Sequence, residues 1–100
     1  MRKVIFSNRA STRLRKLLEY LESNWSVRVK KNFIIKLDKG LNQIKKFSES
    51  SQQSEIQKGL HRLIVTKQTI LYYRFDSKTI KVITMFDNRM DPKKLNKEIK

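Results

Sequence analysis

The sequence predicts an α+β domain in which an N-terminal strand and an antiparallel two-helix hairpin pack on an antiparallel β-meander. Residues 60–91 contain three segments rich in β-branched and aromatic side chains, separated by links of two residues. Residues 8–24 and 27–47 repeat apolar side chains at helical spacing. A length of 100 residues suits one domain with one modest core, so residues 1–100 are assigned to a single domain.

The first predicted elements are a short strand and a helix. Residues 3–6 form the strand, and Ser7 or Asn8 then offers a side-chain oxygen to the unpaired amides of the first helical turn. The helix ends near residues 22–24, and Ser26 is placed to cap the next helix. The apolar stripe of the first helix consists of Leu14, Leu17, Leu18 and Leu21.

The second predicted helix runs from Val27 to about Phe47 and is the longest element. Gly40 lies inside it, at a cost of roughly 1 kcal/mol relative to alanine. A close approach to the first helix would explain the glycine, and so would indifference to the side chain there. The short link between the helices predicts an antiparallel hairpin that the sheet covers. Its apolar stripe consists of Val27, Phe33, Ile34, Leu37, Leu41, Ile44 and Phe47.

The three C-terminal strands follow a polar loop at residues 48–58. The links at residues 67–68 and 77–78 are too short for a crossover, so the strands are predicted to be antiparallel. In the middle strand, alternation separates Leu71, Tyr73 and Phe75 from Ile70, Tyr72 and Arg74. In the last strand, the same pattern separates Ile80, Val82 and Phe86 from Lys81, Ile83 and Met85.

Charge is the strongest compositional signal. The chain has 24 Lys and Arg against 9 Asp and Glu, a formal net charge of +15. Such an excess attracts polyanions or acidic proteins, although a solvated lysine-rich surface is an alternative. The absence of cysteine excludes disulfides and cysteine-based zinc sites. No apolar run approaches the roughly 20 residues that span a bilayer, and the first run is too short for a signal peptide. We therefore expect a cytoplasmic protein with no membrane partner.

Cations on or beside the predicted strands form the candidate binding site. Arginine holds a phosphate or carboxylate with two parallel hydrogen bonds, although Arg89 could instead pair with Asp87 or Asp91. The candidate binding residues are Arg62, Arg74, Lys81, Asn88, Arg89, Lys93 and Lys94.

The residue types present bear on three kinds of chemistry: metal binding, phosphate binding by a glycine-rich loop, and metal-free RNA cleavage. His61 has no second histidine or cysteine with which to bind a metal, and no glycine-rich phosphate loop exists, so neither metal nor cofactor is expected. Metal-free RNA cleavage needs a base and an acid near the 2′-hydroxyl and the leaving group. If the chain were a nuclease, its catalytic candidates would be His61, Arg62, Tyr73 and Arg89.

The order of these elements resembles the RelE/ParE superfamily of toxins from bacterial type II toxin–antitoxin modules. The similarity covers nearly the whole chain, and the segments that support it are YLESNWS, GLHRLIV, ILYYRF and FDNRMDP. The resemblance implies a compact α+β toxin and a cognate antitoxin that wraps it and blocks its toxicity. With the +15 charge, we expect that antitoxin to be acidic. No small-molecule substrate is expected.

Within that superfamily, RelE-like members cleave messenger RNA on the ribosome, whereas ParE-like members inhibit DNA gyrase. The resemblance places Arg62 and Arg89 on two RelE-like basic positions. Ile64, Ile70 and Leu95, however, occupy the positions of a lysine, an arginine and a tyrosine. An aliphatic side chain can neither hold a phosphate nor transfer a proton. The sequence therefore favours a ParE-like toxin that acts by binding. A ribosome-dependent endoribonuclease and a basic nucleic-acid-binding module are the alternatives.

Overall fold

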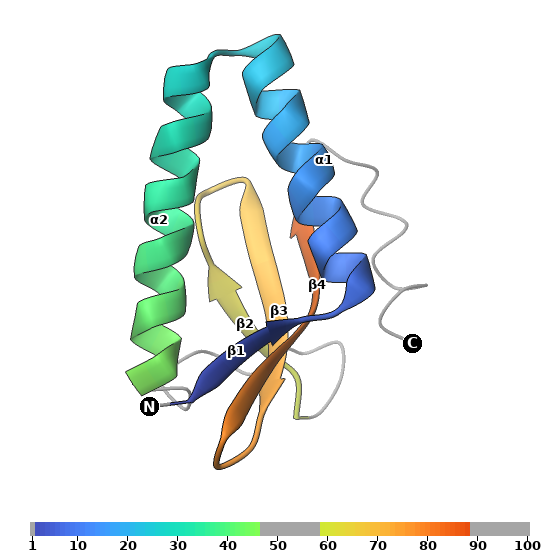
Figure 1. Ribbon diagram of the computed structural model, residues 1–100, viewed down its shortest axis with the longest axis vertical. Helices are drawn as coiled ribbons and strands as arrows, with labels where there is room; N and C mark the ends of the chain where they lie inside the picture. The colour runs from blue at the N-terminus through green and yellow to red at the C-terminus, as the bar shows by residue number, and fades with distance from the viewer. Residues whose placement is uncertain (1, 47–58, 89–100) are drawn as a thin grey trace.

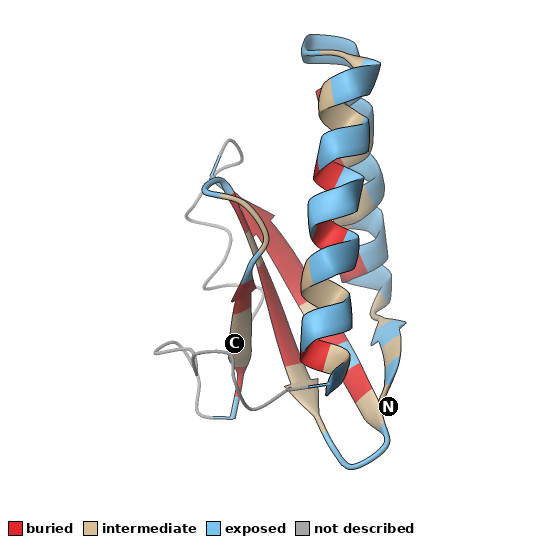
Figure 2. Cartoon of the chain, turned by 90° about the vertical axis from the view of Figure 1, so that its left-hand side faces the viewer, coloured by how far each residue is buried: buried red, intermediate tan, exposed pale blue. Residues whose placement is uncertain are grey.

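The computed structural model describes residues 2–46 and 59–88 (Figure 1). In chain order its elements are β1 (Lys3–Phe6), α1 (Asn8–Asn24), α2 (Val27–Lys46), β2 (His61–Ile64), β3 (Thr69–Phe75) and β4 (Thr79–Asp87). The strands form one sheet in the order β1-β4-β3-β2, and both helices lie against the same face of it (Figure 2). The predicted α+β architecture is confirmed. Phe47 and the predicted loop at residues 48–58 lie outside the described residues.

The sheet is mixed because β1 joins the meander at its β4 edge. β1 runs parallel to β4, with Lys3 opposite Thr79 and Phe6 opposite Val82. The other two strand pairs, β3 with β4 and β2 with β3, are antiparallel as their short links require. The chain thus leaves β1 at one edge of the sheet, forms the helical hairpin on one face and re-enters the sheet at β2, the opposite edge.

Serine side chains begin both helices, as the sequence predicts. The Ser7 side-chain oxygen accepts a hydrogen bond from the Ala10 amide at 3.0 Å. At the start of α2, the Ser26 side-chain oxygen accepts from the Val29 amide at 3.1 Å. Each serine satisfies an amide that has no partner within its helix. The tight link at residues 25–26 therefore ends one helix and begins the next.

The main core lies between the helices and the sheet. Val27 and Ile34 were expected in it, but they are 47% and 41% exposed, so this part of the prediction is wrong. Side chains on a helix advance by about 100° per residue, and the sheet meets α2 along the row through Phe33 and Leu37. Val27 and Ile34 lie on the flank of that row. The buried residues of the core are Ala10, Leu17, Leu21, Phe33, Leu37, Ile44, Leu63, Leu71, Tyr73, Ile80, Val82 and Met85.

A β-bulge in β4 changes which side chains face the helices. Tyr72 pairs with Thr84 and Tyr73 with Val82, so Ile83 is an extra residue in β4. Alternation therefore shifts by one after Val82. The prediction that Phe86 shares the face of Val82 is wrong, since Met85 packs in the main core and Phe86 packs on the other face of the sheet.

Ser7 anchors this bulge as well as capping α1. Its hydroxyl donates a 2.6 Å hydrogen bond to the Ile83 carbonyl oxygen. Its backbone amide donates to the Val82 carbonyl oxygen at 2.9 Å. One residue thus joins the end of β1, the start of α1 and the irregular part of β4.

Side chains hold the two hairpin turns, which explains why neither contains glycine or asparagine. The Thr66 hydroxyl oxygen accepts from the amides of Gln68 and Thr69, both at 3.1 Å. One Asp76 carboxylate oxygen accepts from the amides of Lys78 at 2.8 Å and Thr79 at 2.7 Å. Such local acceptors stabilise a turn without a residue at positive φ. In the described part of the chain, no non-glycine residue has a positive φ.

Gly40 allows α2 to approach the sheet rather than α1. A β-carbon built at this position would lie 2.9 Å from Leu63 Cδ2. That separation is shorter than ordinary van der Waals contact, and Leu63 is buried in β2. Of the two explanations that the sequence allows, a close contact is therefore the correct one, but its partner is β2 and not the first helix.

Candidate functional site

Three of the predicted binding residues lie together on the sheet face opposite the helices. Arg62 is on β2, Arg74 on β3 and Lys81 on β4. Arg74 and Lys81 are directly opposite each other across the strand pair, and Arg62 is opposite Tyr72, two residues before Arg74. Side chains alternate along each strand, so all three cations project from one face. We call Arg62, Arg74 and Lys81 the basic sheet face.

A small apolar cluster lies beside these cations on the same face. Leu60, Tyr72 and Phe86 are buried in it, and Ile70 and Ile83 pack against them. Burial raises the pKa of Tyr72 above its ordinary value, and the positive charge of Arg62 opposes this in part. The phenol therefore stays protonated at neutral pH and is a hydrogen-bond donor rather than a base.

Gly59 adds a feature that the sequence interpretation missed. It is exposed, its φ is +82°, and a β-carbon there would lie 3.1 Å from an Arg74 guanidinium nitrogen. The chain thus passes close to the Arg74 head group immediately before β2. A glycine between a polar segment and a strand is a sequence signal for such an approach, although it does not identify the neighbour.

The other predicted binding residues do not join this group. Asn88 is exposed beyond the end of β4, where its amide donates to the Gln68 carbonyl oxygen at 2.8 Å. Five residues of strand separate that end from Arg74, roughly 17 Å at about 3.3 Å per residue. Arg89, Lys93 and Lys94 lie outside the described residues. Asp87, considered as a partner of Arg89, is buried and accepts a 2.6 Å hydrogen bond from the Thr69 hydroxyl.

The residues considered for RNA cleavage lie on two faces of the sheet. His61 stacks on Tyr73 with ring centroids 5.6 Å apart and lies 5.0 Å from the Phe75 ring. Tyr73 belongs to the main core and has no exposed surface. Arg62, the neighbour of His61 in β2, projects from the opposite face. A substrate bound to Arg62 would therefore be separated from His61 and Tyr73 by the sheet.

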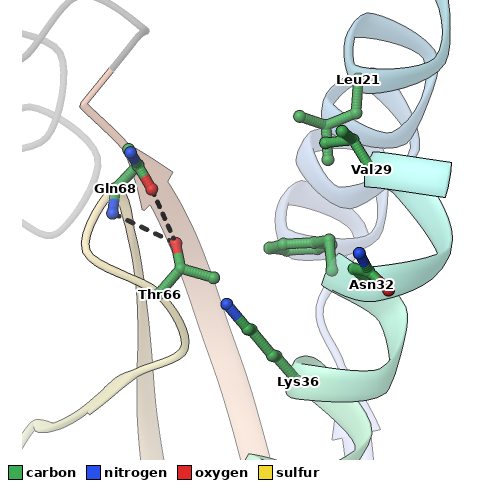
Figure 3. A pocket seen from close by; sticks show the side chains of 7 residues that line it. Leu21, Val29, Asn32, Lys36, Thr66 and Gln68 are labelled. Atoms are coloured by element: carbon green, nitrogen blue, oxygen red, sulfur yellow. Dashed lines mark hydrogen bonds between the residues drawn. The ribbon is translucent and has the colours of Figure 1, made fainter. Parts of the chain in front are cut away.

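A pocket of about 240 Å³ opens between α2 and the β2–β3 turn, at the edge of the main core (Figure 3). Lys36 extends from α2 across its mouth toward Thr66, and Gln68 is held beside Thr66 by the turn. The sequence interpretation missed this site because its walls come from α1, α2 and a distant turn. The lining residues are Leu21, Val29, Asn32, Phe33, Lys36, Thr66 and Gln68.

Within residues 2–46 and 59–88, no three or more His, Cys, Asp or Glu residues cluster in a way that could hold a metal ion. Over the same residues, no helix is both long enough and apolar enough to cross a membrane.

Comparison with known families decides the assignment. The model of a family described as the ParE toxin of the type II toxin–antitoxin system parDE matches residues 4–92, which include nearly all of the six elements. The chain belongs to the ParE toxin family. This confirms the RelE/ParE resemblance on its ParE side. A search of curated proteins gave no match.

Solved structures with the fold of this ParE-family toxin include the chromosomal ParDE TA system from P. aeruginosa, with 13% identity, a TM-score of 0.65, and coverage of 87% of this chain and 96% of that one. The E. coli DinJ-YafQ complex matches with 15% identity, a TM-score of 0.56, and coverage of 89% and 96%. YafQ from E. coli strain BL21(DE3) matches with 16% identity, a TM-score of 0.52, and the same coverage. At these identities the similarity shows the fold.

Proposed function

We propose that this ParE-family toxin inhibits growth by binding a target, with DNA gyrase as the first candidate, and that an acidic cognate antitoxin neutralises it. The observation that supports binding is the basic sheet face. Like charges directly opposite each other in an antiparallel pair destabilise a sheet, and Arg74 and Lys81 form such a pair. Three cations that project from one face attract an anionic surface, so the arrangement favours an acidic partner.

The positions of His61 and Tyr73 favour binding over RNA cleavage. Tyr73 is fully buried, and His61 is stacked against it on the side of the sheet away from Arg62. General acid–base catalysis needs its groups within hydrogen-bond reach of one substrate. The neutral Tyr72 beside Arg62 is a poor base for the same chemistry.

The antitoxin is proposed to bind along the helical hairpin and the edge of the sheet. A formal charge of +15 attracts an acidic segment, and apolar side chains remain exposed on the hairpin, among them Ile34 and Ile35. A partner that binds only the folded toxin raises its melting temperature by mass action. Co-purification that yields only free toxin, together with an unchanged melting temperature on adding the antitoxin, would contradict this part of the proposal.

The activity is tested by inducing the toxin and comparing DNA supercoiling with messenger RNA integrity as growth stops. We expect altered supercoiling and intact messenger RNA. Arg62→Ala, Arg74→Ala and Arg89→Ala should weaken growth inhibition, while Lys39→Ala, an exposed lysine on α2, serves as the control. Codon-phased cleavage that disappears in His61→Ala would instead make this toxin a ribosome-dependent endoribonuclease.

A further inference from the structure

The pocket between α2 and the β2–β3 turn combines an apolar floor with a polar rim. Leu21 and Phe33 in its floor belong to the main core, and Val29 packs against that core. Its polar lining comes from Asn32, Lys36, Thr66 and Gln68, and Lys36 extends toward the turn that carries Thr66 and Gln68. Its volume of about 240 Å³ is below the roughly 300–1,000 Å³ of small-molecule sites. A pocket of this size can take side chains of a macromolecular partner.

Lys36 gives the pocket its charge. It is the single ionisable residue among the seven lining residues, none of which is acidic. Its ammonium group extends toward the β2–β3 turn (Figure 3), and no hydrogen bond or ion pair ties it to the described part of the chain. The amide groups of Asn32 and Gln68 can each donate two hydrogen bonds. A carboxylate entering the rim would meet one cation and amide donors.

A second groove on the surface differs from the α2 pocket because its cations are paired with carboxylates. It lies along α1, where Phe6, Leu14 and Leu18 form an apolar strip. The charges on its rim are already paired, with Arg15 at 3.5 Å from Glu19 and Lys30 at 2.8 Å from Glu22. That groove offers no uncompensated cation. The α2 pocket offers such a cation in Lys36, so charge complementarity favours this pocket as the binding site of an acidic segment.

We propose that the α2 pocket anchors the antitoxin through an acidic side chain that meets Lys36 and a neighbouring apolar side chain that packs against the partly buried Val29. This inference rests on the proposed function, since it requires an antitoxin partner. It names the chemistry that the partner must present. A charge paired with Lys36 away from water would act mainly on the dissociation rate, whereas the other surface lysines would act mainly on the rate of association.

The test is a titration of the cognate antitoxin into the toxin and into Lys36→Glu, Lys36→Gln and Lys78→Glu. Lys78 is exposed in the β3–β4 turn, away from the helical hairpin; it does not line the pocket, and its reversal changes the net charge equally. We expect Lys36→Glu to lower the affinity by about tenfold or more, Lys36→Gln to lower it less, and Lys78→Glu to leave it within about threefold. Thermal melting checks folding, and Lys36→Gln remains informative if Lys36→Glu is destabilised.

Charge reversal in the antitoxin identifies the contact directly. Each acidic residue of its toxin-binding segment is changed to lysine and titrated against both Lys36→Glu and the unmodified toxin. One such change, beside an apolar residue, should restore binding to Lys36→Glu while weakening binding to the unmodified toxin. Absence of any restoring change would contradict the anchor.

The remaining outcomes separate this inference from the function on which it rests. Equal affinities of Lys36→Glu and Lys78→Glu for the antitoxin would overturn the anchor and leave the antitoxin partner in place. No binding to the unmodified toxin would remove the antitoxin partner itself, and the anchor with it. Loss of affinity in Lys36→Glu for a single-stranded oligonucleotide but not for the antitoxin would assign the pocket to nucleic acid instead.

Discussion

The Thr69 hydroxyl donates a 2.6 Å hydrogen bond to an Asp87 carboxylate oxygen, joining the first residue of β3 to the last residue of β4. Both residues are buried, with exposed fractions of 0% and 1%. A carboxylate removed from water requires hydrogen-bond donors, and Thr69 supplies one. The contact therefore holds the start of β3 against the end of β4.

Thr69→Val keeps the side-chain shape but removes the donor to Asp87. Hydrogen bonds to charged groups contribute about 1.5–3 kcal/mol, so we expect the free energy of unfolding to fall by about that amount. Urea denaturation measures it. Thr84→Val is the control, because within residues 2–46 and 59–88 the buried Thr84 hydroxyl makes only a long, 3.4 Å hydrogen bond to the Met85 carbonyl oxygen. Equal losses in both variants would show that the Asp87 contact adds nothing specific.

Asp76 makes the stability of the β3–β4 turn depend on pH. Hydrogen bonds from the Lys78 amide, the Thr79 amide and the Thr79 hydroxyl lower the pKa of Asp76 below its ordinary value. A carboxylate with a lowered pKa in the folded state stabilises the fold above its unfolded pKa of about 4, and this contribution is lost as pH falls through the folded pKa. Asp76→Asn should therefore melt at a lower temperature than the unmodified protein at neutral pH, and the difference should vanish in acid. A difference in melting temperature between the two proteins that stays constant from neutral to acidic pH would contradict this assignment.

Ser7 and Ser26 both cap helices, but only Ser7 also binds the bulge in β4. Loss of an N-cap side chain costs about 1 kcal/mol, and loss of a further hydrogen bond costs about 1 kcal/mol. We expect Ser7→Ala to lower the free energy of unfolding by about 2 kcal/mol and Ser26→Ala by about 1 kcal/mol. The difference measures the 2.6 Å hydrogen bond to the Ile83 carbonyl oxygen. If denaturation gave the same value for the two variants, that hydrogen bond would have no net effect.

Lys81→Glu should change stability and function in opposite directions. It replaces repulsion from Arg74 by attraction across the strand pair, which is expected to raise the free energy of unfolding by about 0.2–1 kcal/mol. The same change removes a cation from the basic sheet face, so growth inhibition should weaken. Lys39→Glu on α2 controls for net charge. A Lys81→Glu protein that remains fully toxic would remove Lys81 from the proposed binding surface.

The sequence by itself determined the elements and their order. Helical spacing and the serines at positions 7 and 26 located both helices, because local hydrogen bonding and burial of one stripe depend on neighbouring residues. Alternation and two-residue links located the antiparallel meander for the same reason. Alternation also placed Arg74 on the side of β3 that faces away from the core, where the basic sheet face lies.

Only the tertiary structure decided which flank of α2 meets the sheet, where β4 is irregular and which distant residues share a site. The extra residue at Ile83 is compatible with uninterrupted alternation in the sequence, and only pairing with Tyr72 and Tyr73 reveals it. Gly40 approaches Leu63, and Lys36 reaches the turn at Thr66, across more than twenty residues of chain. These contacts depend on how whole elements dock, and local sequence patterns contain no information about a neighbour that folding brings from elsewhere.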